Sequence, residues 1–194
     1  MLKLFIHLLI TTLMISYATP LLKTGQTKSY DPDGVEVLDG SVKDDGYYQA
    51  GTTRSYSRSG DVVTDNVTGL QWQDNESIKK PLITKENYKA ENYDDTSGDT
   101  AATYCSNLSL NGGGWRLPSI EELETLVDNG MYNPSTTAGV FQYIESSGID
   151  YYWSSTINVN TSFVAWYIEF RNGQSLNNDT KKNSNYIRCV RNGQ

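Results

Sequence analysis

The chain has 194 residues, with 16 Lys and Arg against 23 Asp and Glu, which gives a net charge of −7. The length fits one domain with an extension, and the acidic balance argues against general binding of nucleic acid. The single histidine, His7, lies in an N-terminal apolar run. Without that run, Ser-His-Asp catalysis, Cys-His catalysis and the usual zinc sites are excluded, so we expect no enzymatic activity.

Residues 1–18 predict a secretory signal peptide. They combine Lys3 with a mostly apolar run and a Ser-Tyr-Ala ending that suits cleavage after Ala18. A membrane anchor is the alternative, but the run is short and is interrupted by three hydroxyl residues. No later run is long enough to span a bilayer. We therefore expect an exported chain of 176 residues that is secreted, displayed on the cell surface or periplasmic.

Residues 19–60 are predicted to form an N-terminal extension rich in Tyr, Gly and Ser. It contains a degenerate repeat, since TGQTKSY at 24–30 is echoed by AGTTRSY at 50–56. Asp-Gly pairs at 33/34, 39/40 and 45/46 favour turns, so we expect short strands or an extended segment with hairpins. The run DPDGVEVLDG is similar to a calcium loop but lacks the alternating third ligand and the final Glu of an EF-hand, which favours turns over calcium.

From Asp61 the sequence predicts a compact domain that begins with a pair of strands. VVTDNVTGLQWQDN alternates polar and apolar residues around a turn at 66–69. Leu70 and Trp72 then share one face of the second strand. The residues that follow, 74–98, are strongly polar, and we interpret them as an inserted loop.

The first predicted helix covers residues 100–108 and turns Cys105 inward on an apolar stripe. Ser97 or Asp99 is the expected N-cap, because short polar side chains accept the first free amides of a helix. After this helix, the glycines of NGGGWRLPSIEELETLV, residues 111–127, predict a tight turn.

The second predicted helix begins at Ser119, which precedes Glu122 by three residues, as in a capping box. Just before it, Trp115 and Leu117 are expected to anchor the glycine turn in the core. The helix then lays one apolar stripe on a sheet, formed by Ile120, Leu123, Leu126 and Val127.

The C-terminal third of the chain predicts antiparallel strands. A loop at 129–148 precedes them, and Asn172-Gly173 is a strong hairpin signal between two of them. The strand-like runs lie at 151–156, 163–170, 174–176 and 185–191.

Cys105 and Cys189 are the only cysteines, and in an oxidising compartment a lone pair most simply forms one disulfide. The bond would close 84 residues and tie the first helix to the last strand. On the chain-entropy model it would stabilise the fold by about 4 to 5 kcal/mol. Two free buried thiols are the alternative.

Six motifs, taken in order, resemble the Lcl C-terminal domain family, named after a collagen-like adhesin of Legionella. They are VTDNVTGLQWQ, AATYCSNL, GGGWRLPSIEELETLV, YYWSST, AWYIEF and YIRCVR, and together they cover roughly residues 61–192. The resemblance implies an α+β, C-type-lectin-like fold in which two helices pack on twisted antiparallel β-sheets, with one disulfide.

The same resemblance carries expectations about partners. In the Legionella adhesin such a domain is associated with trimerisation and with binding of sulfated glycosaminoglycans, which implies a homo-oligomer, a trimer by resemblance. This chain lacks the collagen-like Gly-X-Y repeats and is acidic. A related fold occurs in formylglycine-generating enzymes, but their chemistry uses extra cysteines, and none remains here once the disulfide is assigned.

The conspicuous aromatic and basic residues of these motifs are interpreted as structural. Tryptophans at alternating strand positions or beside a glycine turn are more often core than sugar platforms. An arginine within such a motif more plausibly pairs with a carboxylate or backbone carbonyls than with a ligand. The tryptophans and arginines concerned are Trp72, Trp115, Trp153, Trp166, Arg116 and Arg188. Pro118, in the same motif as Trp115 and Arg116, is also interpreted as structural.

Two polar loops, at 157–162 and 171–184, are the expected place for function, because lectin-type scaffolds present variable surface through loops. Calcium is a candidate cofactor, with Asp94, Asp95, Asp99, Asn178 and Asp179 as ligands, although the Glu-Pro-Asn and Gln-Pro-Asp triplets of calcium-dependent lectins are absent. The candidate ligand-binding residues are Asn158, Asn160, Arg171, Asn177, Asn178, Asp179, Lys181 and Lys182.

Two functional hypotheses follow. The first is a secreted or surface-exposed, non-catalytic binding module, similar to an adhesin, that recognises a glycan or an extracellular protein through its polar loops. The alternative is a structural or assembly subunit of an exported complex, in which the extension of residues 19–60 pairs with a neighbour.

Overall fold

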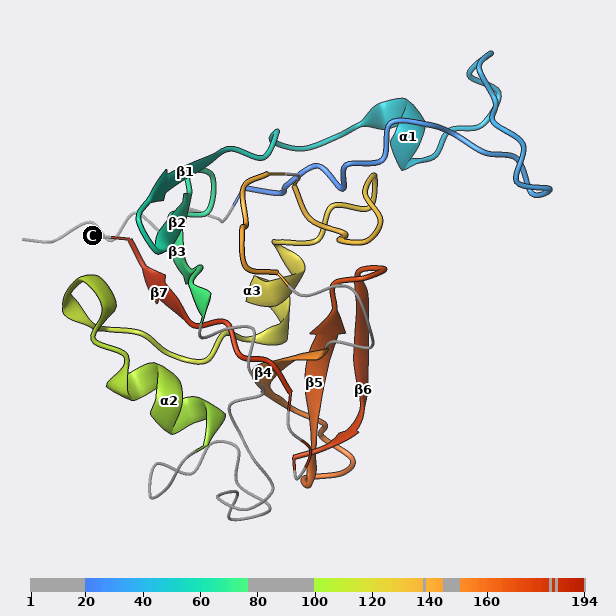
Figure 1. The fold of residues 1–194 in the computed structure, drawn as a ribbon. Coiled ribbons are helices and arrows are strands. Elements are labelled where there is room, and N and C mark those ends of the chain that lie inside the picture. Colours follow the sequence, from blue (N-terminus) through green and yellow to red (C-terminus); the bar gives the residue numbers. More distant parts are fainter. Residues whose placement is uncertain are drawn as a thin grey trace, which may run out of the picture.

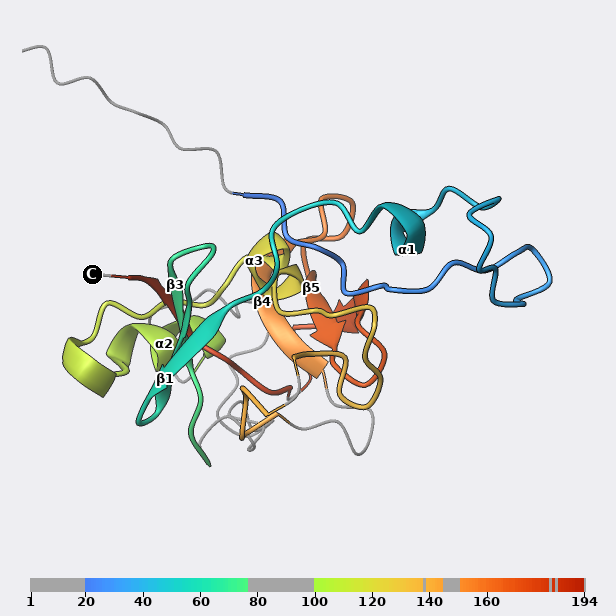
Figure 2. The ribbon, with the colours of Figure 1, turned by 90° about the horizontal axis from the view of Figure 1, so that it is seen from above.

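The computed structural model describes residues 20–76, 100–137, 139–144, 151–181, 183 and 185–193. Within these ranges the fold is α+β, as predicted, with two antiparallel sheets, short helices and one disulfide. Helix α3 lies between the two sheets, and α2 lies beside the larger one (Figures 1 and 2). The predicted signal peptide and most of the predicted polar insert fall outside the described residues.

The larger sheet has four strands in the order β1-β2-β3-β7. The predicted strand pair is the β2–β3 hairpin, in which Oδ1 of Asp65 accepts hydrogen bonds from the amides of Val67 (2.8 Å) and Thr68 (3.2 Å). Gly69 completes the turn with a φ of +77°, which favours glycine. The strands are β1 (Tyr56–Ser59), β2 (Val62–Asp65), β3 (Leu70–Gln73) and β7 (Val190–Asn192).

The smaller sheet has three strands, β4 (Tyr151–Ile157), β5 (Val164–Glu169) and β6 (Gln174–Thr180). The expected hairpin turn joins β5 to β6, where the amide of Gly173 donates to the carbonyl of Glu169 (2.9 Å). Strand β6 runs to residue 180, well beyond the predicted end at 176. Its last residues are polar, but ladder pairing uses backbone groups, so side-chain polarity does not end an edge strand.

Helix α2 (Ala101–Asn107) has Thr100 as its N-cap, so the expectation of Ser97 or Asp99 was wrong. The amide of Thr103 donates to Oγ1 of Thr100 (3.2 Å), and the amide of Thr100 donates to Oγ1 of Thr103 (2.7 Å). Two threonines therefore complete a reciprocal capping box with no need of an upstream residue.

Helix α3 (Ile120–Glu124) has the predicted capping box, with the amide of Glu122 donating to Oγ of Ser119 (3.2 Å). It is shorter than its apolar stripe, because the amides of the following residues bond to carbonyls three positions back. Leu126 and Val127 are nevertheless buried. The remaining helices are α1 (Asp45–Tyr48) and the 3₁₀ turn η2 (Leu110–Gly112), and no helix in the described ranges is long and apolar enough to cross a membrane.

Residues from both faces of the two sheets are buried in two separate hydrophobic clusters. Successive residues of β2 enter different clusters, with Val62 in one and Val63 in the other. The first cluster contains Cys105 of α2 and the second contains Leu123 of α3. Each predicted helix therefore covers its own side of the sheets.

The predicted last strand, 185–191, divides between the two sheets, so its expected continuity was wrong. Tyr186 pairs in parallel with Tyr152 of β4, and its amide donates to the carbonyl of Tyr151 (2.8 Å). Only from Val190 onward does the chain join β3 as strand β7. A segment that crosses between sheets cannot form one ladder.

The extension projects away from the two sheets in both ribbon views (Figures 1 and 2). Short strands or an extended segment with hairpin turns were expected, with a turn at Asp45-Gly46, but this pair lies inside the short helix α1. Asp44 is the cause, because its Oδ1 accepts the amide of Tyr47 (3.1 Å) as an N-cap. The predicted turn at Asp31 is present, with its Oδ1 accepting the amide of Val35 (2.8 Å).

The base of the extension packs on the end of α3. The guanidinium of Arg54 donates to the carbonyls of Thr125 and Val127, which are left free where the helix ends. The amide of Asn129 also donates to the carbonyl of Thr24 (2.6 Å). The extension is therefore attached to the domain through its two ends.

Candidate functional site

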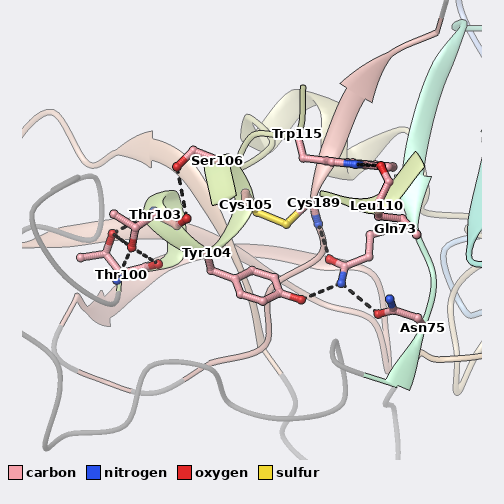
Figure 3. The surroundings of a disulfide bond; sticks show 10 residues. All are labelled: Gln73, Asn75, Thr100, Thr103, Tyr104, Cys105, Ser106, Leu110, Trp115 and Cys189. Atoms are coloured by element: carbon pink, nitrogen blue, oxygen red, sulfur yellow. Dashed lines mark hydrogen bonds between the residues drawn. A yellow bond between two sulfur atoms is a disulfide. The ribbon is translucent and has the colours of Figure 1, made fainter. Parts of the chain in front are cut away.

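The predicted disulfide joins Cys105 of α2 to Cys189, with an S–S distance of 2.08 Å and both residues fully buried. Beside it, Nε2 of Gln73 donates to the hydroxyl of Tyr104 (2.7 Å), and the amide of Cys189 donates to Oε1 of Gln73 (3.3 Å) (Figure 3). The alternative of two free thiols is therefore excluded. The surrounding polar side chains hydrogen-bond to one another, and the bond between Gln73 and Tyr104 connects β3 to α2.

The glycine turn before α3 is held by Arg191, which sequence reasoning missed. Its Nη1 donates to the carbonyls of Asn111 (2.8 Å) and Gly113 (2.7 Å), and its guanidinium lies 4.5 Å from the ring centre of Trp115. Nε1 of Trp115 in turn donates to the carbonyl of Leu110 (2.7 Å). Only its position in the last motif, one residue after a buried Val, could have singled out this arginine.

Arg116 pairs with Glu122 through two hydrogen bonds of 2.6 Å each. Burial tends to raise the pKa of Glu122, but the bonds from Arg116 and from the amide of Ser119 outweigh it, so this pKa is lowered. Pro118 is buried, and its carbonyl accepts the amide of Ser155 (2.7 Å). These contacts connect the start of α3 to β4.

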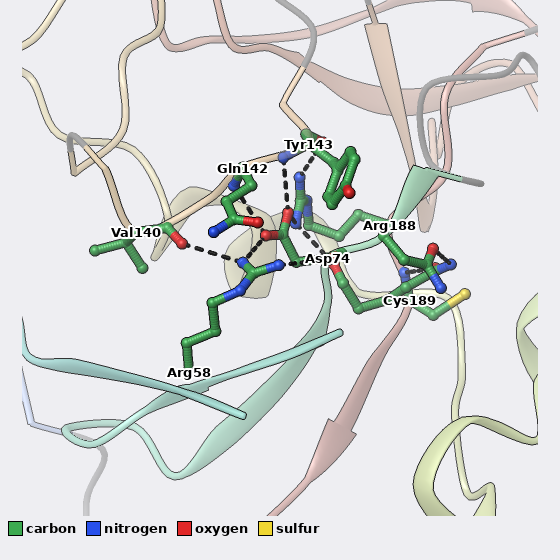
Figure 4. A network of polar contacts seen from close by, with 9 residues as sticks. Arg58, Asp74, Val140, Gln142, Tyr143, Arg188 and Cys189 are labelled. Atoms are coloured by element: carbon green, nitrogen blue, oxygen red, sulfur yellow. Dashed lines mark hydrogen bonds and ion pairs between the residues drawn. The ribbon is translucent and has the colours of Figure 1, made fainter. Parts of the chain in front are cut away.

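A second polar network surrounds Asp74, which is completely buried beside Arg188 (Figure 4). The Asp74 carboxylate accepts hydrogen bonds from Nη1 of Arg188 (3.0 Å), from Arg58, and from the amides of Gln142 (2.9 Å) and Tyr143 (3.2 Å). Burial tends to raise the pKa of Asp74, but the Arg188 charge and these bonds outweigh it and lower the pKa.

The network is closed to a ligand, because Arg188 also donates to the carbonyls of Gln73 (2.7 Å) and Tyr143 (2.8 Å) and lies 4.7 Å from the ring centre of Phe141. The sequence predicted that Arg188 pairs with a carboxylate or with backbone carbonyls, and it does both. The sequence did not identify Asp74 as the carboxylate, because this residue was placed in the polar insert.

The tryptophans offer little surface for stacking on a sugar. Trp72, Trp115 and Trp153 are buried, and Trp166 is half-buried against the second hydrophobic cluster. A sugar platform needs an exposed ring face.

The candidate ligand-binding residues lie at two opposite ends of the smaller sheet. Arg171 follows β5 at the hairpin end, where its Nε donates to the hydroxyl of Tyr132 (3.2 Å). Lys182 lies outside the described residues. The others gather at the far end, where the β4–β5 loop meets the end of β6; they are Asn158, Asn160, Asn177, Asn178, Asp179 and Lys181.

The polar side chains at this far end bond largely to their own loops. Nδ2 of Asn158 donates to the carbonyl of Asn177 (3.2 Å), and its Oδ1 accepts the amide of Asn160 (3.0 Å). The Asp179 carboxylate accepts from Nδ2 of Asn185 (2.7 Å) and from the amide of its neighbour Thr180. The hydroxyl of Tyr167 donates to Asn178, and Lys181 is only 3% exposed. Most of these groups therefore shape the loop.

The loop presents large apolar side chains to solvent, beside the exposed polar residues Asn160 and Ser162. Ile157, Val159 and Phe163, which we call the apolar tip, are 41%, 93% and 55% exposed. The loop is held by its own backbone, since the amide of Asn158 donates to the carbonyl of Val164 (3.1 Å) and the amide of Lys181 donates to the carbonyl of Phe163 (3.0 Å). Sequence reasoning missed the tip, although hydrophobic residues within INVNTSF were its signal.

In the described part of the chain, no three His, Cys, Asp or Glu side chains are grouped to hold a metal ion. Of the candidate ligands, Asp94, Asp95 and Asp99 lie outside the described residues. Both carboxylate oxygens of Asp179 accept hydrogen bonds from neighbouring residues.

The family model of the Lcl C-terminal domain matches residues 61–191, a range that contains both cysteines, the glycine turn and the apolar tip. Neither a curated protein nor a solved structure matches the chain.

Proposed function

This chain belongs to the Lcl C-terminal domain family, and we propose that it is an adhesin-like, non-catalytic binding module that is exported through the signal peptide of residues 1–18. The family suggests a surface module and is not associated with catalysis. A buried disulfide between distant segments suits an oxidising compartment. Absence of histidine after residue 18 is in keeping with a role in binding.

The observation that carries the proposal is the apolar tip. Val159 and Phe163 stand in solvent on a loop that backbone hydrogen bonds hold in place, so few degrees of freedom are lost when a partner covers them. Asn160 and Ser162 of the same loop are also exposed, which adds polar groups next to the apolar centre. This arrangement favours an extracellular protein as the ligand over a glycan.

The test is binding of the purified chain, without residues 1–18, to panels of extracellular proteins and glycans. A double variant, Val159→Ser with Phe163→Ser, should bind its protein ligand at least tenfold more weakly, because burial of each side chain contributes about 1.5 to 3 kcal/mol. The matched control is Met131→Ser with Tyr132→Ser, two exposed residues (38% and 65%) outside the tip. If the wild-type chain bound no member of either panel, the proposal would be contradicted.

A second candidate function, assembly through the extension, is supported by a separate observation. The projecting part of the extension leaves Val35, Leu38, Tyr47 and Tyr48 exposed, at 47% to 89%. Exposed apolar groups on a projecting segment favour contact with a neighbouring subunit. Light scattering should then show an oligomer that Leu38→Ser with Tyr48→Ser dissociates, whereas a monomeric wild-type chain would rule this function out.

We also propose a C-type-lectin-like fold for the domain. Support comes from two short helices on antiparallel sheets, a disulfide that links α2 to the C-terminal segment, and long loops. An experimental structure that superposes poorly on C-type lectin domains would remove this part.

A further inference from the structure

A groove of about 560 Å³ lies beside α3, at the opposite end of the smaller sheet from the apolar tip. Most of its walls come from residues 20–24, from the outward side of α3 with the residues that follow it, and from the start of β6 with the turn before it. Arg54 and Thr68 complete the lining. The volume is within the range of sites for small molecules, roughly 300 to 1,000 Å³. The groove shares no residue with the tip, so it is available for a separate ligand.

The walls of the groove are fixed before any ligand arrives. The backbone of Leu21 accepts the amide of Thr52 (2.8 Å), and Arg54 binds the carbonyls at the end of α3. On the other side, a Cβ at Gly173 would lie only 2.6 Å from Cγ1 of Val127, so the hairpin turn approaches α3 closely. A preformed groove binds with little ordering cost.

The lining combines aliphatic surface with short polar groups. Leu22 and Val127 supply the aliphatic part, and Asn129 supplies an amide. The hydroxyl of Ser175 donates to Oε1 of Glu124 (2.6 Å), which orients that carboxylate and leaves its second oxygen available to accept from a ligand. Amides and oriented carboxylates bind sugar hydroxyls, while aliphatic groups suit the C–H face of a sugar ring.

The charge of the groove restricts the saccharide further. Glu121 and Glu124 lie one turn apart on the exposed side of α3, and no described ion pair involves either of them. Arg54 is the basic lining residue, and its guanidinium is already engaged by backbone carbonyls. A sulfate or carboxylate on the ligand would therefore meet the charges of two carboxylates against the charge of one guanidinium, whose two terminal nitrogens already donate to carbonyls.

We propose that this groove is a binding site for a saccharide that is uncharged or carries an amino group, and that it rejects sulfated saccharides. The inference goes beyond the proposed function, because that function is carried by the apolar tip at the other end of the sheet. It assigns Glu124 and Asn129 to the ligand hydroxyls and Glu121 to an amino substituent.

The test is calorimetric titration of the chain with three probes of equal length: an N-acetylglucosamine oligosaccharide, its de-N-acetylated form, and a heparin-derived sulfated oligosaccharide. The first two should bind, the second more tightly at low salt, and the third should not. The proposal would be overturned if the sulfated probe bound as tightly as the other two probes. It would also be overturned if neither of the two unsulfated probes bound. Tighter binding of a lysine-rich peptide than of both saccharides would also overturn it.

Variants locate the site. Glu124→Gln with Ser175→Ala should weaken both saccharides about tenfold, whereas Glu121→Gln should remove only the preference for the amino form. Asp33→Asn, at an exposed carboxylate in the extension, is the matched control and should change neither. Thermal melts establish that each variant is folded. The Val159→Ser, Phe163→Ser variant should bind saccharide normally, which separates failure of this site from failure of the tip.

Discussion

The Asp74–Arg188 network and the apolar tip are opposite departures from the usual distribution of residues. Asp74 and Arg188 are charged and completely buried, whereas Val159 and Phe163 are apolar and largely exposed. Each arrangement is unfavourable without a partner. The charges find partners within the chain, but the described residues supply none that covers the tip. The comparison indicates that the first region serves the fold and the second serves binding.

The largest expected effect on stability comes from removing the disulfide at Cys189, the residue next to Arg188. Replacing Cys105 and Cys189 together by Ala should lower the free energy of unfolding by about 4 to 5 kcal/mol, because the bond closes 84 residues. Urea denaturation under non-reducing conditions measures this. An unchanged unfolding midpoint would show that the disulfide contributes nothing to the stability of the region around Asp74 and Arg188.

The next effect concerns the buried charges themselves. Asp74→Ala leaves Arg188 without its carboxylate in the interior and should destabilise the chain by about 3 to 5 kcal/mol. Arg116→Ala breaks the exposed pair with Glu122 and is the control, with an expected loss of at most about 1 kcal/mol. Comparable losses of stability in the two variants would contradict the conclusion that the Asp74 network stabilises the fold.

Acid should reveal the same network. The folded pKa of Asp74 lies below its ordinary value of 3.8, so its ionised form stabilises the fold fully above that value. This contribution is lost as the pH falls through the lowered folded pKa. The stability difference between the wild-type chain and Asp74→Asn should therefore be constant near neutrality and shrink below about pH 3.8. A difference independent of pH would contradict this assignment.

The smallest expected effect on stability is at the apolar tip. Val159→Ser with Phe163→Ser should change the free energy of unfolding by no more than about 0.5 kcal/mol per site, since neither side chain belongs to a hydrophobic cluster. Urea denaturation again provides the measurement. A loss of several kcal/mol would mean that the tip is covered within the chain, which would remove the contrast between the two regions.

Local signals in the sequence predicted much of the fold. The capping box at Ser119, the hairpins at 66–69 and 172–173, and the disulfide each depend on residues whose preferences act over short distances or on a single possible pairing. The helix α1 was missed because the cap at Asp44 competed with a strong turn signal at Asp45-Gly46.

The features that escaped prediction depend on contacts between distant segments. The 185–191 run reads as one strand, yet Tyr186 and Val190 pair with different sheets, which no local pattern encodes. The loop at 157–162 reads as polar, but folding uses the side chain of Asn158 to hold the loop and leaves Val159 exposed. Which side chains of a loop remain available is decided by the fold and cannot be taken from composition.

Hydrogen exchange of the chain with and without its extracellular protein ligand tests the central claim most directly. We predict that added protection is concentrated in residues 157–163, while the amides of Gln142 and Tyr143 that bond to Asp74 exchange at unchanged rates. Protection at α3 or the extension with none at 157–163 would contradict the assignment of binding to the apolar tip.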